Sequence, residues 1–174
     1  MGGTARILGE TTRISVEHVV VASKRPYQQV IDALEARLGP VVNWDAILDQ
    51  LMDAKVSWEQ FTQECEAHIG PSGLTLFYKV GHSPYLSVLG KSSRAIQYTI
   101  GNPVLASHMT RHTPEVALYA PFKLVVYQDE EGKTFVAYDN FASLLAPYQN
   151  EEITRTAQEV QQKLAALVVE AIGE

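Results

Sequence analysis

The C-terminal segment, residues 150–172, constrains the fold more than any other part of this chain. The pattern predicts a long helix that begins at Asn150, and Glu151 and Glu152 in its first turn suit the positive end of the helix dipole. Seven apolar residues then recur on one helical face: Ile153, Ala157, Val160, Leu164, Leu167, Val168 and Ile172. A stripe of this length has to be covered, and a helix lying across a β-sheet is the simplest arrangement that covers it.

Several strand patterns can supply that sheet. FKLVVYQ and KTFVAYD flank the turn Asp129–Gly132 and predict a hairpin. RISVEHVVVAS, LTLFYKV and AIQYTI predict three further strands, and an amphipathic helix over 26–38 follows the first of them. The sequence therefore predicts an α+β fold, a two-layer sandwich in which a mainly antiparallel sheet has helices packed on one face.

Residues 43–69 predict a helical insertion. Asn43 can cap one short helix through Asp53, while Ser57 and Gln60 form the pattern of a capping box for a second helix. This pair could be a lid over a pocket or a contact surface. We expect a single domain over 1–174, made of a strand and helix at 12–38, the insertion at 43–69, a core at 74–148 and a C-terminal helix at 150–172.

Composition excludes some partners. Acidic residues exceed basic ones by 20 to 14, and no block of like charges occurs, so we expect no nucleic-acid partner. Neither a signal peptide nor an apolar run of about 20 residues is present, which predicts no membrane partner. The single cysteine, Cys65, lies on the apolar face of its helix and predicts a small buried hydrophobe in a reducing compartment, so we expect a cytoplasmic protein.

One stretch, from Tyr78 to Tyr148, carries a recognisable order of motifs. IGNPVLASHM and YAPFKLVVYQDEEGKTFVAYDN contain a hydrophobic-Gly-Asn-Pro turn, a short helix, an acidic turn with glycine and a strand ending in Tyr-Asp. In this order the chain resembles the domain of unknown function 302 family, and residues 12–38 also fit. The resemblance implies a small α/β sandwich with a mainly antiparallel sheet, often associated as a homodimer, and it implies no activity. The insertion at 43–69 and the Tyr119-Ala120-Pro121 step depart from the family pattern.

The motif Gly101-Asn102-Pro103 predicts a sharp turn from a strand into a helix. Glycine is permissive, asparagine can bond the local backbone and proline fixes φ, so the turn explains the motif by itself. Backbone amides at the start of the helix could also hold an anion, which would make Asn102 a substrate-binding residue.

His108 and His112 are four residues apart, so a helix would place both imidazoles on one face. Two nitrogens are too few for a metal site, and no spacing supplies a third ligand from His82, Glu115 or Asp139, so we expect no metal. The pair is either solvent-exposed or used for acid–base chemistry near neutral pH.

Other candidate residues surround this pair in the sequence. Arg111 and Lys123 could hold a carboxylate or enolate oxygen, Tyr119 could line a pocket, and Tyr138 with Asp139 could orient a substrate. His18 falls on the same strand face as Ile14, Val16 and Val20, which predicts an interior position.

Two functions remain open from the sequence. The first is a small-molecule-binding protein, either a carrier or a cofactor-independent acid–base enzyme of the isomerase, cyclase or lyase type, with His108, His112, Tyr138 and Asp139 as catalytic candidates. Because glycine loops for phosphates, nucleophile elbows and dinucleotide fingerprints do not occur, we expect no cofactor. The second is a non-enzymatic homodimeric accessory or regulatory module. Buried Trp44 and Trp58 would favour the first function, and exposed ones the second.

Overall fold

A computed structural model of the chain describes residues 9–174, and they form the predicted α+β sandwich. One antiparallel sheet has the strand order β1-β5-β4-β3-β2. The strands are β1 (His18–Ser23), β2 (Thr75–Gly81), β3 (Arg94–Gly101), β4 (Phe122–Gln128) and β5 (Thr134–Asp139). The helices are α1 (Tyr27–Arg37), α2 (Trp44–Asp53), α3 (Trp58–Glu66), α4 (Ser83–Val88), α5 (Pro103–Thr110), α6 (Phe141–Leu145) and α7 (Glu151–Ile172), with short 3-10 helices η1 (Pro114–Leu118) and η2 (Ala146–Tyr148).

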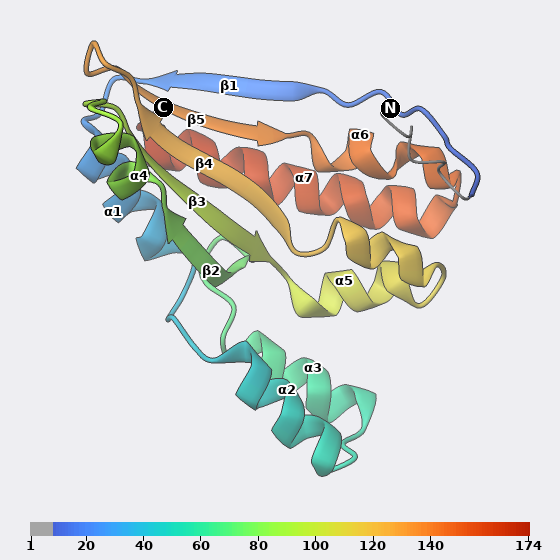
Figure 1. Ribbon diagram of the computed structural model, residues 1–174. Helices are drawn as coiled ribbons and strands as arrows, with labels where there is room; N and C mark the ends of the chain where they lie inside the picture. The colour runs from blue at the N-terminus through green and yellow to red at the C-terminus, as the bar shows by residue number, and fades with distance from the viewer. Residues whose placement is uncertain (1–8) are drawn as a thin grey trace, which may run out of the picture.

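The C-terminal helix covers one face of the sheet, as its apolar stripe requires. Figure 1 shows α7 lying across the sheet, with α1 beside it on the same side. All seven apolar residues of the predicted stripe are buried. They pack with Val30 and Leu34 of α1 and with alternate strand residues such as Leu124, Val126 and Val136 into one core cluster. The long helix, α1 and the sheet thus share one hydrophobic core. No helix within residues 9–174 is both long and apolar enough to cross a membrane.

The first strand differs from its prediction. β1 begins only at His18, because β5 ends at Asp139 and residues 14–16 have no partner strand. Val19 and Val21 are half-buried towards the core, so His18 points to the opposite face. The prediction of an interior His18 is therefore wrong: its imidazole Nδ1 lies 2.7 Å from Asp139 Oδ1, and its side chain is 63% exposed.

The insertion folds as two short helices that project from the sheet (Figure 1). The predicted caps are confirmed, since Asn43 accepts a bond from the Ala46 amide and Ser57 with Gln60 forms a complete capping box. The chain enters and leaves the insertion through a narrow neck at Gly39 and Gly70. A side-chain carbon on Gly70 would collide with the backbone of residues 37–39, so the two linkers can approach this closely only without one.

The sheet face that points away from α1 and α7 is called the open face below. One row of paired residues crosses its centre from β1 to β2: Val20, Ala137, Val125, Gln97 and Val80. Val20 and Val80 are 49% and 43% exposed. The row is apolar except for Gln97, and β4 is the middle strand of the five.

Candidate functional site

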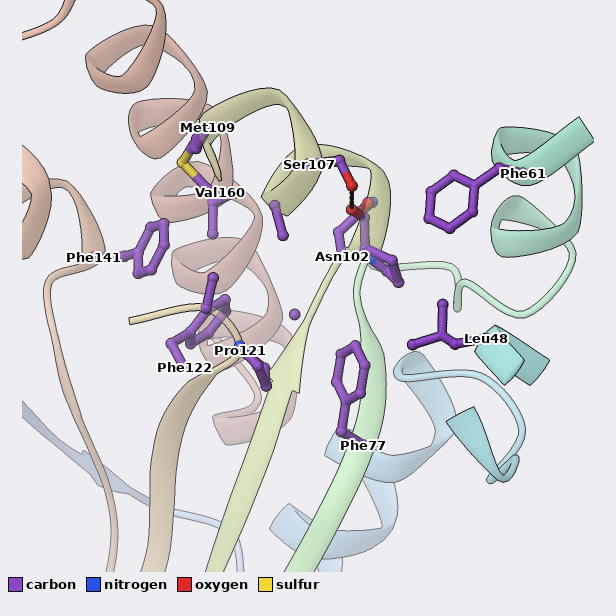
Figure 2. A pocket seen from close by; sticks show the side chains of 14 residues that line it. Leu48, Phe61, Phe77, Asn102, Ser107, Met109, Pro121, Phe122, Phe141 and Val160 are labelled. Carbon is purple, nitrogen blue, oxygen red and sulfur yellow. Dashed lines mark hydrogen bonds between the residues drawn. The ribbon is translucent and has the colours of Figure 1, made fainter. Parts of the chain in front are cut away.

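An apolar pocket lies where the insertion meets the end of β3 and the start of α5. Its volume is about 230 Å³. The insertion contributes Leu48 and Phe61, β2 contributes Phe77, and the far wall is core, with Met109, Phe141 and Val160 (Figure 2). Side chains separated by more than 100 positions in the sequence thus enclose one space.

The turn Gly101-Asn102-Pro103 shapes the floor of this pocket. The Asn102 side chain accepts a hydrogen bond from the Leu105 amide at 3.0 Å and donates one to the Gly73 carbonyl at 3.0 Å. It therefore caps α5 and ties the exit of the insertion to the end of β3. Gly101 keeps the pocket open, since a side-chain carbon there would lie 3.3 Å from Pro121 and 3.5 Å from Phe77.

Two wider depressions adjoin the apolar pocket on the outside of α5 and α3, and together they are called the outer groove below. Trp58 and Ser107 line both of them; His108 and Arg111 line the first, and Lys55 lines the second. Ser107 also lines the apolar pocket, and Phe61 lines the pocket and the depression beside Lys55. Trp58 forms the ridge of the groove: it stacks on Phe61 with ring centroids 5.3 Å apart and meets His108 edge-on at 5.6 Å. Its side chain is 53% exposed.

The ionisable side chains that line these two spaces are few, and all of them are basic. Ser107 donates its hydroxyl to the Pro103 carbonyl at 2.9 Å, which leaves the pocket wall beside it apolar. Lys55, His108 and Arg111 line the outer groove. No aspartate or glutamate among residues 9–174 lines either space, although acidic residues outnumber basic ones in the chain.

Three predicted site residues lie together at this position. Asn102 lines the apolar pocket, and His108 and Arg111 line the outer groove. Asn102 uses both ends of its amide for structure. His108 and Arg111 have no hydrogen-bond or ion-pair partner within the described part of the chain.

The other candidates lie elsewhere. His112 comes after the last turn of α5 and is exposed. It and Arg111 lie near Glu152, whose pKa is lowered chiefly by the hydrogen bond and the charge of Arg155. Tyr138 is buried towards α7, and burial raises the pKa of its phenol.

Asp139 points the opposite way from Tyr138, onto the open face, where it pairs with His18. Lys123 is exposed on that same face, and Tyr119 packs beside Glu115 and Tyr148 in a separate depression. The predicted catalytic residues therefore do not converge on one cavity.

The pocket-forming residues that sequence reasoning missed are the apolar ones. Leu48, Phe61 and Phe77 line the pocket, and the apolar periodicity of their elements does not distinguish a wall that faces a cavity from one that faces packed atoms. Trp44 is buried at 3% exposure against Phe77, with ring centroids 5.3 Å apart, while Trp58 is half-exposed. The two tryptophans thus give opposite indications for the two functions left open above.

Metal ligands do not cluster in the described structure. Within residues 9–174, no three side chains of histidine, cysteine, aspartate or glutamate lie close enough together to hold a metal ion. Cys65 is fully buried as predicted, and burial, followed by the neighbouring Glu64 and Glu66, raises the pKa of its thiol to about 11.

Comparison with known proteins identifies the family. The sequence profile described as "Domain of unknown function DUF302" matches residues 52–171. The chain belongs to the DUF302 family. The match confirms the resemblance seen in the motifs. It begins at Met52, inside the insertion, and ends at Ala171, one residue before the end of α7.

The DUF302 fold is also present in a solved structure. The chain is similar to the crystal structure of an uncharacterized conserved DUF302 protein from Bacillus stearothermophilus, with a TM-score of 0.60 and 18% sequence identity. The alignment covers 88% of this chain and 97% of the other. At this identity the likeness concerns the fold alone. No curated protein matches the sequence.

Proposed function

We propose that this DUF302 protein binds a small, largely apolar molecule in the apolar pocket. The observation that carries the proposal is the pocket itself, because it lies between the insertion and the core and is walled by side chains from both. At about 30 Å³ for each water-sized group, 230 Å³ accommodates roughly seven or eight non-hydrogen atoms. A monocyclic aromatic compound or an eight-carbon chain has this size.

A ligand screen with a pocket-filling variant tests the proposal. Ala106 lines the apolar pocket from α5, so Ala106→Leu places extra carbon atoms in the space that a ligand would use. Ala46→Leu makes the same change at an exposed position of α2 outside the pocket.

Thermal denaturation with small apolar compounds should show stabilisation of the wild type. A compound present at about 100 times its Kd adds about 2.7 kcal/mol, or roughly 5–10 °C in Tm for a chain of this size. The effect should persist in Ala46→Leu and disappear in Ala106→Leu. Equal stabilisation of all three proteins, or none by any compound of this size, would refute the proposal.

If the pocket supports a reaction, His108 is the residue that we assign as its general acid or base. It is the only one of the four predicted catalytic residues that lines the outer groove. His108→Gln should then abolish turnover while leaving ligand affinity within about twofold. A variant that keeps full turnover would exclude this role.

A homodimeric accessory module is the second candidate, and the open face favours it. Val125 lies on the middle strand at the centre of an apolar row, so a two-fold axis through it would place this row against its own copy. Sedimentation analysis should show a dimer that Val125→Glu converts to a monomer. Val169→Glu, at a position of α7 that is 45% exposed, is the matched control and should remain a dimer. A monomeric wild type would exclude this module.

Cytoplasmic localisation also stays a proposal. It is supported by the one cysteine of the chain, which is buried and unpaired. Fractionation of cells that produce the protein tests it.

A further inference from the structure

We infer that the ligand of the apolar pocket is an amphipathic carboxylate, with its apolar part in the pocket and its carboxylate in the outer groove. The inference rests on the proposed function and specifies the chemical class of the ligand. Its basis is the distribution of charge around the site.

The charge around the site is opposite in sign to the net charge of this protein. The chain has a formal net charge of −6, yet the polar rim of the two spaces is formed by Arg111, His108 and Lys55 without any carboxylate among residues 9–174. Two other depressions differ, because Glu10 and Glu115 line one of them, while Glu66 and Glu159 line the other together with Lys163. An anionic group is therefore favoured electrostatically at the outer groove.

Arg111 is the main candidate for holding that group. Its guanidinium has no ion-pair partner within 4.0 Å in the described part of the chain, whereas the nearby Glu152 is already paired with Arg155 at 2.6 Å. A guanidinium presents parallel N–H groups that match the two oxygens of a carboxylate. His108 lies one helical turn earlier on α5 and lines the same groove.

The apolar part of the ligand has a defined path into the pocket. Ser107 of α5 lines the pocket and also the depression that holds His108 and Arg111, so these two spaces adjoin at Ser107. Phe61 lines the pocket and the depression beside Lys55. The Ser107 hydroxyl at this junction already donates its hydrogen bond within α5. A molecule with one charged end and roughly seven or eight apolar atoms therefore fits the two spaces together.

Calorimetry with three probes of equal chain length tests the inference. Octanoate, octanol and octylamine differ only in the head group. Wild-type protein should bind octanoate roughly fivefold more tightly than octanol, equivalent to about 1 kcal/mol, since Arg111 is exposed and exposed ion pairs reach only this magnitude. Octylamine should bind more weakly than octanol.

Two variants separate the contribution of Arg111 from general charge effects. Arg111→Gln should bind octanoate and octanol equally, with octanol affinity unchanged. Lys24→Gln removes one positive charge just after β1, whose last residue, Ser23, pairs with the start of β5. This variant should keep the fivefold preference for octanoate over octanol.

The outcomes distinguish this inference from the proposed function. If octanol and octanoate bind equally to wild type and neither binds Ala106→Leu, the pocket is used but the carboxylate assignment is wrong. A preference that survives Arg111→Gln also overturns the assignment. If no probe binds the wild type, the proposed function fails along with the inference.

Discussion

Filling the apolar pocket should make the protein more stable and less able to bind. Ala106→Leu adds three carbon atoms on α5, and burying each is worth about 0.8 kcal/mol, which gives an upper limit of about 2.4 kcal/mol. Ordering the leucine side chain costs about 0.5–1 kcal/mol. The expected net gain in the free energy of unfolding is therefore about 1.5 kcal/mol. For a chain of 174 residues this raises Tm by roughly 3–6 °C.

The same substitution should remove most of the binding space. Three added carbons occupy roughly 90 Å³ at about 30 Å³ for each water-sized group, so about 140 Å³ of the 230 Å³ remains. An eight-carbon chain no longer fits in that volume. Urea denaturation and calorimetry with octanoate measure the two effects on the same samples.

Higher stability together with lost octanoate binding in Ala106→Leu would identify the pocket as the binding site. Ala46→Leu should change stability by no more than about 0.5 kcal/mol and leave binding intact, because its side chain is exposed on α2. A destabilised Ala106→Leu would mean that the space is already filled by packed atoms. Unchanged octanoate affinity in that variant would mean that the ligand binds elsewhere.

Four further predictions concern stability and burial elsewhere in the fold. Asn102→Ala should lower the free energy of unfolding by about 2–3 kcal/mol, since it removes the α5 cap and the hydrogen bond to the Gly73 carbonyl. Asn102→Asp should keep the cap and lower the free energy of unfolding by only about 1 kcal/mol. Urea denaturation measures both changes. Gly70→Ala should expose the insertion to proteolysis between α2 and α3, because the neck at Gly39 cannot accept a side chain; a digestion pattern like that of the wild type would contradict this. Burial and the hydrogen bond to Glu35 raise the pKa of Tyr98 above 10.0, so the stability that its neutral phenol contributes is complete below pH 10. Above pH 10 the free energy of unfolding should fall by up to about 1.4 kcal/mol per pH unit. Tyr98→Phe should reduce this slope in denaturation series at rising pH. The Cys65 thiol, with a pKa of about 11, should resist alkylation near pH 8 until the protein is unfolded, and rapid labelling of the native protein would refute its burial.

The fold was predictable where one local pattern left one solution. The α7 stripe, the hairpin of β4 and β5 and the caps at Asn43 and Ser57 are confirmed, because each depends on residues within a few positions of one another. β1 was predicted too long, since strand length depends on where the partner β5 ends. The short helices α4 and η1 were missed because they contain too few residues for a helical period to appear.

The site was predictable only in part, for a geometric reason. Asn102, His108 and Arg111 could be placed near one another because they lie within ten positions on one turn and one helix. Tyr138 and Asp139 are adjacent in sequence but face opposite sides of the sheet, which strand alternation already requires. The walls formed by Leu48 and Phe77 depend on how the insertion docks at its neck, and that relation has no local signal in the sequence.

The most direct test of the account is an amide NMR titration of the protein with octanoate. The account predicts chemical-shift changes at both walls of the apolar pocket, near Leu48 and Phe61 in the insertion and over Gly101–Ser107, extending to Arg111 at the outer groove. Shifts centred on Val125 and the open face, or no saturable shifts at any position, would contradict the proposal that this pocket is the functional site.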